Sequence, residues 1–102
     1  MSKRQMFVEG GSTISFSCTS VTSAAQSLGN VGSDLLLTNI GESVAYVNFG
    51  TLSTITAATT DLPVPAGTQF TRPRDVISEL YAAAICDSGA TTTLKITPGT
   101  GS

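Results

Sequence analysis

The chain has 102 residues, of which 40% are hydrophobic and 12% are charged, and it contains no histidine. Histidine is the usual proton shuttle near neutral pH and the commonest neutral metal ligand, so its absence excludes Ser-His-Asp triads, HExxH zinc sites and Cys/His zinc fingers within the chain. Five Lys and Arg against seven Asp and Glu give a net charge of −2. The basic residues are scattered, which disfavours nucleic acid as a partner.

Small and β-branched residues dominate the composition. The chain holds 13 Ser, 16 Thr and 10 Gly. Thr fits the pleated backbone of a strand, and Gly supplies the positive φ angles of tight turns. The composition therefore predicts strands, turns and hydroxyl-lined surfaces.

Residues 1–12 have the composition of a flexible N-terminal arm. Polar residues come first, Met6, Phe7 and Val8 then form a short apolar patch, and a pair of glycines ends it. We expect this arm to become ordered when it meets a partner.

The first strand is predicted over residues 13–19. The chain alternates strictly there, with Ile14, Phe16 and Cys18 on one side and hydroxyl-bearing residues on the other. This period of two indicates a half-buried strand with its hydroxyls outside.

The next stretch combines a loop with a strand, turn, strand unit. Residues 20–32 show little periodicity and predict a loop, with a short strand around 24–28. Residues 34–38 and 43–49 predict two strands joined by a turn. Both faces of the second strand carry apolar side chains, as expected deep inside a sandwich or barrel.

A weak strand and a crossing segment follow. Residues 51–60 are rich in Thr, Ser and Ala around Ile55 and predict a weak strand. Pro63 and Pro65 then remove backbone donors, so residues 61–67 cannot form a central strand and should cross between sheets.

The region from residue 67 to 86 holds one ambiguity. Residues 67–71 predict a strand, 72–75 a charged corner, and 76–77 the start of a short extended element. Residues 78–86 have good helix propensity and are compatible with two helical turns. We favour a buried strand, because the apolar run is short, follows a β-rich chain and stops at a turn signal.

The last strand is predicted over residues 91–97. Thr92, Leu94 and Ile96 alternate there with more polar residues. Pro98 should end the pairing, and residues 99–102 should form a short flexible tail.

Together these elements predict a single all-β domain over residues 13–98. Seven or eight short strands, with turn signals about every ten residues, are typical of an antiparallel β-sandwich or a small β-barrel. The longest strongly apolar stretch, residues 80–86, is far shorter than the roughly 20 residues of a membrane-crossing helix. No secretion signal follows the basic Lys3 and Arg4, so we expect synthesis in the cytoplasm and no membrane partner.

The two cysteines, Cys18 and Cys86, lie in different predicted strands. They could pair in a disulfide, but in a reducing cytoplasm widely spaced cysteines are more often small buried hydrophobic residues. We favour the second interpretation. Neither cysteine has a neighbouring His or Lys that would make it a reactive thiolate.

Acidic residues are the remaining candidates for catalysis or metal binding. A glycosidase needs two of them across a cleft, which a chain this short has little room to form, and a calcium site needs several converging oxygen ligands. Most of these residues lie within two positions of a Gly or Pro, near predicted turns, where Asp and Glu are ordinary. They are Glu9, Asp34, Glu42, Asp61, Asp75, Glu79 and Asp87. We expect no catalytic or metal-binding residue, no cofactor and no enzymatic activity.

The charged corner and the apolar patch are the candidate partner interface. Arg72 and Arg74 either form a solvated corner with a local ion pair to Asp75 or dock on an acidic patch of a partner. Phe70 adjoins a charged segment and Phe7 a flexible one, so each belongs either to the core or to an interface. The candidate interface residues are Met6, Phe7, Val8, Phe70, Arg72 and Arg74.

Four segments follow one another through the last two thirds of the chain. They span residues 44–50, 57–67, 82–89 and 92–101, and the last contains a Thr-Pro-Gly-x-Gly ending. In this succession the chain resembles small virion structural proteins of tailed bacteriophages, over about residues 34–102. The resemblance implies an all-β, non-enzymatic part that is added in many copies to a capsid or a tail.

These observations lead to the hypothesis of a capsid decoration, or cement, protein that binds the outer shell and stabilises it. Its expected partners are the major capsid protein and further copies of itself, and a homotrimer is favoured because three-fold lattice positions invite cyclic symmetry. The expected location is the virion, after synthesis in the host cytoplasm. Two alternatives stay open: a tail, neck or fibre-associated structural module, and a carbohydrate-binding or adhesion module, which the lack of Trp disfavours.

Overall fold

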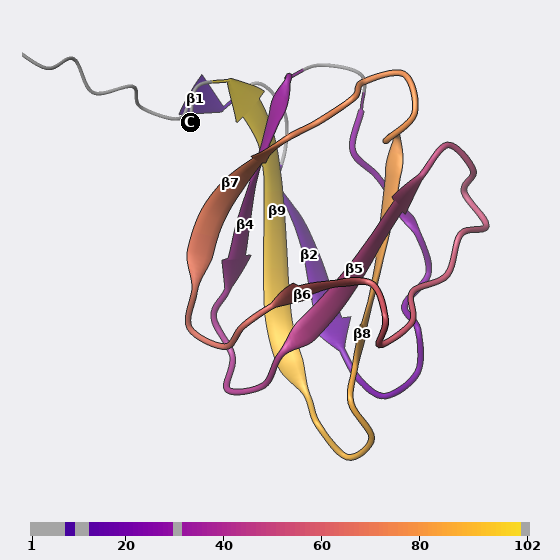
Figure 1. The fold of residues 1–102 in the computed structure, drawn as a ribbon, viewed down its shortest axis with the longest axis vertical. Helices are drawn as coiled ribbons and strands as arrows, with labels where there is room; N and C mark the ends of the chain where they lie inside the picture. Colours follow the sequence, from indigo (N-terminus) through magenta and orange to yellow (C-terminus); the bar gives the residue numbers. More distant parts are fainter. Residues whose placement is uncertain (1–7, 10–12, 30–31, 101–102) are drawn as a thin grey trace, which may run out of the picture.

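The computed structural model describes residues 8–9, 13–29 and 32–100, and these ranges form an all-β molecule (Figure 1). The predicted fold class is therefore confirmed. The strands are β1 (Val8–Glu9), β2 (Ile14–Cys18), β3 (Gln26–Ser27), β4 (Asp34–Asn39), β5 (Ala45–Gly50), β6 (Leu62–Val64), β7 (Gln69–Pro73), β8 (Tyr81–Cys86) and β9 (Thr92–Thr100). Within the described ranges, no helix has the length and apolar character needed to cross a membrane.

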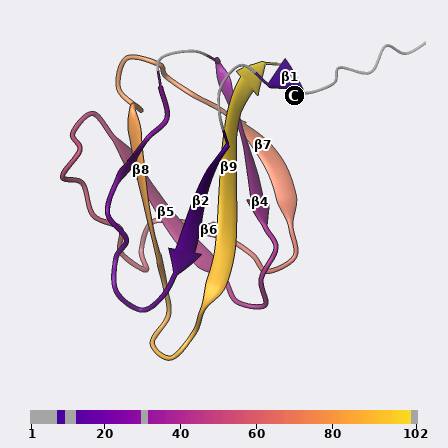
Figure 2. The ribbon, with the colours of Figure 1, turned by 180° about the vertical axis from the view of Figure 1, so that it is seen from behind.

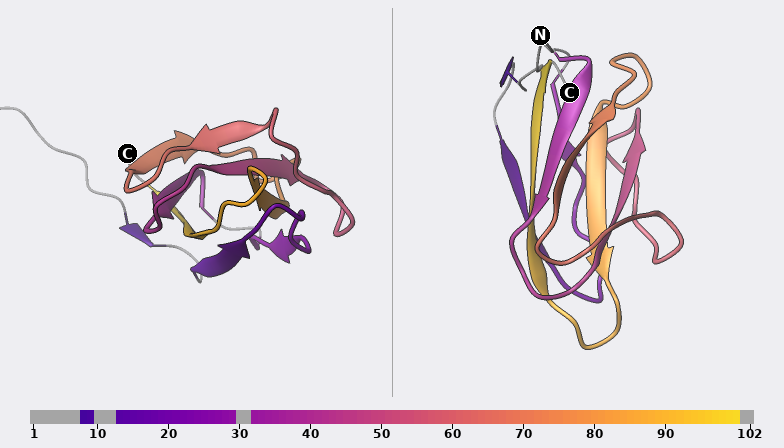
Figure 3. Two further views of the ribbon diagram at one scale, coloured as in Figure 1. Left: turned by 90° about the horizontal axis from the view of Figure 1, so that it is seen from below. Right: turned by 60° about the vertical axis from the view of Figure 1, so that its left-hand side comes forward.

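The strands form two antiparallel sheets that pack face to face, so the fold is a sandwich. The first sheet has the order β1-β9-β4-β7, with β2 also paired to β9, and the second has the order β3-β8-β5-β6. Figure 2 shows β9 between β2 and β4, and the right-hand view of Figure 3 shows the two layers. β1 and β2 follow one another along the same side of β9, since Val8 pairs with Thr100 and Ile14 with Ile96.

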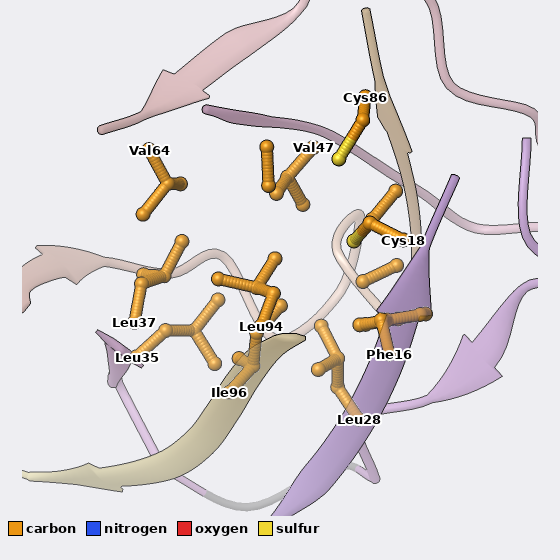
Figure 4. Packing of buried hydrophobic residues seen from close by; sticks show 13 residues of the cluster. Phe16, Cys18, Leu28, Leu35, Leu37, Val47, Val64, Cys86, Leu94 and Ile96 are labelled. Atoms are coloured by element: carbon orange, nitrogen blue, oxygen red, sulfur yellow. The ribbon is translucent and has the colours of Figure 1, made fainter. Parts of the chain in front are cut away.

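The core lies between the sheets and contains the residues at alternate strand positions (Figure 4). The first sheet contributes large side chains such as Phe16, Leu37 and Ile96, and β8 of the second contributes the small Ala82 and Ala84. Large residues facing small ones fill the space between two close layers at the density of a protein interior. The alternation predicted for residues 13–19 and 91–97 is confirmed.

The ambiguous segment, residues 78–86, contains a strand, β8, which is buried on both faces. Alternate alanines face the core, while Ala83 points to the outer face and is still 0% exposed. Opposite Ala83, Asn48 donates from Nδ2 to the carbonyl oxygen of Thr56 at 2.8 Å, which holds the β5–β6 connection over this face. A strand covered on both sides is a continuous apolar run, so sheet pairing overrides the helix propensity of these alanines.

Two expectations about connecting segments are wrong. Residues 51–60 form turns without a strand, and residues 76–78 form a turn instead of starting an extended element. The first segment folds back on β5, where a Cβ added to Gly50 would lie 2.8 Å from Cγ2 of Ile55. The second is closed by Asp75, whose Oδ1 accepts a hydrogen bond from the backbone N–H of Ile77 at 2.9 Å.

The two prolines near β6 have the predicted effect. Among the described strands, β6 pairs with β5 alone and is one of the two edge strands of the second sheet. Residues 65–68 then lead to β7 in the first sheet. The prediction that this segment crosses between sheets is confirmed.

Pro98, in contrast, does not end the last strand, because β9 continues to Thr100. The hydrogen bond from Ile40 N to Thr93 O, at 3.0 Å, fixes which residues of β9 bond toward β4. By this alternation the nitrogen of Pro98 faces away from β4. No hydrogen bond to β4 is lost there, so Gly99 and Thr100 pair with β1 instead of belonging to a flexible tail.

Asn39 ends β4 inside the core and holds the β4–β5 turn. Its side chain is 1% exposed, and its Nδ2 donates to the carbonyl oxygens of Ser43 at 2.8 Å and Val64 at 2.9 Å. Its Oδ1 accepts from the Gly41 N–H at 3.0 Å and from the Thr92 hydroxyl at 2.6 Å. The predicted turn is confirmed, and its first residue connects β4, β6 and β9.

Cys18 and Cys86 are both free and both 1% exposed. Burial raises the pKa of the Cys18 thiol to about 12, with a further contribution from the neighbouring Cys86. Burial also raises the pKa of Cys86. Both thiols are therefore protonated at neutral pH and pack as small hydrophobic residues, which confirms the favoured interpretation.

Candidate functional site

The predicted interface residues that the structure describes lie mainly on or beside β7, at one edge of the first sheet. Phe70 and Arg72 are opposite two core leucines of β4, so their side chains are on the face that is turned toward the second sheet. Phe70 packs against the core cluster, which favours its core interpretation. Met6 and Phe7 lie outside the described residues, and Val8 belongs to β1.

Arg72 covers the rim of the core between the two sheets. Its guanidinium carbon lies 4.5 Å from the ring centroid of Phe49 on β5, in a cation–π contact. Its Nη2 also pairs with Oε2 of Glu79 at 3.0 Å. The corner therefore has the expected local ion pair, but the acidic partner is Glu79 and not the adjacent Asp75.

Arg74 differs from both expectations, because it is buried and is neither solvated nor presented to a partner. The residue is 6% exposed. Its Nε donates to the carbonyl oxygen of Glu79 at 3.0 Å, its Nη1 to that of Leu28 at 3.4 Å, and its Nη2 to that of Gly29. Burial lowers the pKa of Arg74, and the charge of Glu79 acts in the opposite direction. These bonds tie the end of β3 to the β7–β8 connection and occupy the guanidinium within the chain.

The outer edge of β7 exposes backbone hydrogen-bonding groups. Arg74 N donates to Ser33 O at 2.8 Å, which fixes the alternation along the β4–β7 pair. By this alternation the N–H and C=O groups of Gln69 and Thr71 point away from β4. β7 is the last strand on its side of the sheet, so within the described residues no strand lies beside these groups. Such an edge can accept an additional extended segment.

Hydroxyl groups line the outer face of the same sheet. Thr13 Oγ1 and Thr97 Oγ1 are hydrogen-bonded at 2.6 Å, and Gln69 Nε2 donates to Thr38 Oγ1 at 3.0 Å. The strand registers place these residues on the outer face: Ser15, Ser17, Asp34, Leu36, Thr38, Gln69, Thr71, Pro73, Thr93, Lys95 and Thr97. Thr13 joins them through its hydrogen bond to Thr97. The sequence predicts hydroxyls outside on β2 and β9. In the folded sheet these hydroxyls lie beside the polar side chains of β4 and β7. This neighbourhood depends on the strand order, which the sequence does not reveal.

A polar groove of about 670 Å³ opens at the end of the sandwich where β2 ends. Residues 17–19, 41–43 and 89–93 line it, and among these described residues Glu42 carries the one carboxylate. The groove thus has hydroxyls and backbone groups but no facing pair of carboxylates, which acid–base hydrolysis of a sugar requires. In the part of the chain that the structure describes, no three His, Cys, Asp or Glu side chains are grouped to hold a metal ion.

The other shifted pKa values have local causes. Hydrogen bonds from the Ile77 N–H and from Ser78 lower the pKa of Asp75 within its turn. Desolvation and the charge of Asp87 raise the pKa of Tyr46, whose hydroxyl donates to Asp87 Oδ2 at 3.3 Å. These groups lie in separate turns and strands and do not converge on one place.

Comparison of the chain with protein-family models, with curated proteins and with solved structures finds no match. The arrangement is therefore interpreted from its own geometry. Two of its features, the strand edge at Gln69 and Thr71 and the hydroxyl-lined face beside it, suit contact with another surface.

Proposed function

We propose that this protein is a structural component of a phage virion, and specifically a capsid decoration protein that binds the outer shell and stabilises it. The observation that carries the proposal is the β7 edge, where Gln69 and Thr71 present backbone groups next to the hydroxyl-lined face of the first sheet. An extended segment of a shell subunit would add to this edge through backbone hydrogen bonds. The polar face would lie against the shell surface.

The sequence resemblance supports the proposal independently. Its four segments fall on β5, on the connection into β6 together with β6 itself, on β8 and on β9. Three of these strands are interior members of the two sheets. The resemblance therefore concerns the framework of the sandwich, which is the part expected to be shared with virion proteins of the same architecture.

The mechanism is stabilisation by binding. A protein that binds the assembled shell but not its separated subunits stabilises the shell by mass action, by about 2.7 kcal/mol per site when its free concentration is 100 times Kd. Repetition over the lattice multiplies this effect. We propose a homotrimer as the binding unit, because three-fold positions of the shell match cyclic symmetry. Sedimentation equilibrium of the purified protein checks this state.

The test uses particles stripped of this protein. They are heated with and without the purified protein, and the temperature of genome release is recorded together with co-sedimentation. We expect the added protein to sediment with the heads and to raise the release temperature. Absence of binding together with an unchanged release temperature would refute the decoration role.

The same experiment separates the proposal from its alternatives. A protein that sediments with tails, in few copies per particle, would be a tail, neck or fibre module. The polar groove is the feature that favours a carbohydrate-binding module. Glycan binding by the folded monomer, lost in a Glu42→Ala variant, would support that alternative instead.

A further inference from the structure

The two cysteines are far apart in the sequence but meet inside the sandwich. Cys18 is the last residue of β2 in the first sheet, and Cys86 is the last residue of β8 in the second. Both belong to the same buried cluster. Figure 4 shows their side chains next to one another in the core.

The two sheets converge at this corner. The carbonyl oxygen of Thr19 accepts a hydrogen bond from the N–H of Cys86 at 2.7 Å, so the chain leaves the first sheet after Cys18 and immediately lies alongside β8. The two cysteine backbones are therefore closer than the usual separation of about 10 Å between stacked sheets. The two thiols are also near enough for each to shift the pKa of the other.

We propose that Cys18 and Cys86 form a redox modification site, at which a low-molecular-weight disulfide such as oxidised glutathione converts them to an intramolecular disulfide that joins the two sheets. One protein thiolate attacks the small disulfide, forms a mixed disulfide and releases one small thiol. The other protein thiolate then displaces the second small thiol. Two protein S–H bonds are replaced by one S–S bond, and the two protons and two electrons pass to the glutathione sulfurs.

Folding increases the equilibrium constant of disulfide formation but lowers its rate. Folding holds the two sulfurs together, whereas the unfolded chain must close a long loop to bring them into contact. Since both thiols are buried and protonated, exchange is slow near neutral pH and becomes faster at alkaline pH as the thiolate fraction rises.

The decisive measurement is the equilibrium constant of disulfide formation in a glutathione redox buffer at mildly alkaline pH. It is measured once in native buffer and once in urea at the same pH, with acid quenching and mass spectrometry. The product is recognised by the loss of two hydrogen atoms from the monomer mass. We expect the constant in native buffer to be roughly 100-fold larger than in urea, because a disulfide that suits the native geometry stabilises that state.

A native constant equal to or smaller than the one in urea would overturn the proposal, since it would mean that the folded sandwich resists the bond. The single variants Cys18→Ser and Cys86→Ser serve as controls, and each should give only a glutathione adduct. The melting temperature gives a second readout on the unmodified sequence. The oxidised protein should melt roughly 10 °C or more above the reduced one, and a lower melting temperature would also overturn the proposal.

Discussion

Asn39 and Arg74 each stabilise the fold through hydrogen bonds to groups that come from distant parts of the chain. Asn39 connects the β4–β5 turn to Val64 and Thr92, and Arg74 connects the β7–β8 region to Leu28 and Gly29. A buried carbonyl or hydroxyl that loses its partner costs about 1–3 kcal/mol. The two side chains therefore matter more to stability than their positions at turns suggest.

The first prediction concerns Asn39. We expect Asn39→Ala to lower the free energy of unfolding by about 3 kcal/mol, because several buried polar groups lose their partner at once. Asn48→Ala is the matched control, and it should cost about 1 kcal/mol or less, because Asn48 makes one side-chain bond in a partly exposed setting. Urea denaturation of both variants checks the difference. Equal losses would contradict the role assigned to Asn39.

The second prediction separates the two arginines. Arg74→Lys should lower the free energy of unfolding by about 2 kcal/mol, because an ammonium group cannot reproduce the planar set of donors that reaches three carbonyls. Arg72→Lys keeps a cation near Glu79 at a partly exposed site and should cost about 1 kcal/mol or less. Thermal or urea unfolding gives the comparison. A weakened shell interaction of Arg74→Lys with no loss of stability would instead mean that Arg74 acts at the interface.

At the scale of single elements, a strand could be predicted from the sequence where its own residues alternate between apolar and polar, and could not where its structure depends on neighbouring strands. β2 and β9 alternate strictly, so their inward residues, such as Phe16 and Leu94, could be identified directly. β8 could not be decided by propensity, because a strand covered on both faces has no alternation to detect. β9 can continue past Pro98 because the nitrogen of Pro98 faces away from β4. This orientation depends on how the strands are paired, which local sequence does not show.

The candidate site shows the same limit. The sequence singled out Phe70, Arg72 and Arg74 from their charge and surroundings, but it could not show that these side chains turn inward or become buried. The backbone edge at Gln69 and Thr71 has no side-chain signature at all. It exists because β7 is the last strand of its sheet, and that follows from long-range pairing rather than from local composition.

The third prediction tests the β7 edge as a docking element. Thr71→Pro removes the outward N–H without removing a hydrogen bond to β4, and prolines are tolerated at such edge positions. The variant should fold and bind stripped heads roughly 10-fold more weakly, because one backbone hydrogen bond to the shell is lost. Thr71→Ala keeps the N–H and should bind like the parent protein. Unchanged binding by a folded Thr71→Pro variant would exclude this edge as the contact.

For the whole molecule, the buried thiols add a pH dependence to stability. The pKa of Cys18 is raised from 9.0 to about 12 by burial. A group with a raised folded pKa contributes stability that is complete below the unfolded value, here 9.0, and is lost as the pH rises toward 12. The contribution of the Cys18 thiol to the free energy of unfolding is therefore larger at neutral and acidic pH than at alkaline pH.

The fourth prediction follows from this loss of stability at alkaline pH. Above pH 9.0, the free energy of unfolding should fall by at most about 1.4 kcal/mol per pH unit on account of Cys18. In Cys18→Ala the fall should be shallower over the same range, although the variant starts from its own lower stability. Urea denaturation under reducing conditions at a series of alkaline pH values measures both slopes. Parallel slopes would show that the thiol does not ionise on unfolding.

The pairing of Val8 with Thr100 brings the two ends of the described chain together at one corner, at the opposite end from the β8–β9 turn (Figure 1). A cargo protein joined directly before Val8 or directly after Thr100 would therefore be displayed from the same corner. A short linker from Thr100 to Val8, in place of the residues outside them, would also allow the chain to be cut open at the exposed Ser88 in that turn. Such a circular permutant would keep every strand pairing and would move the point of attachment to the other end of the sandwich.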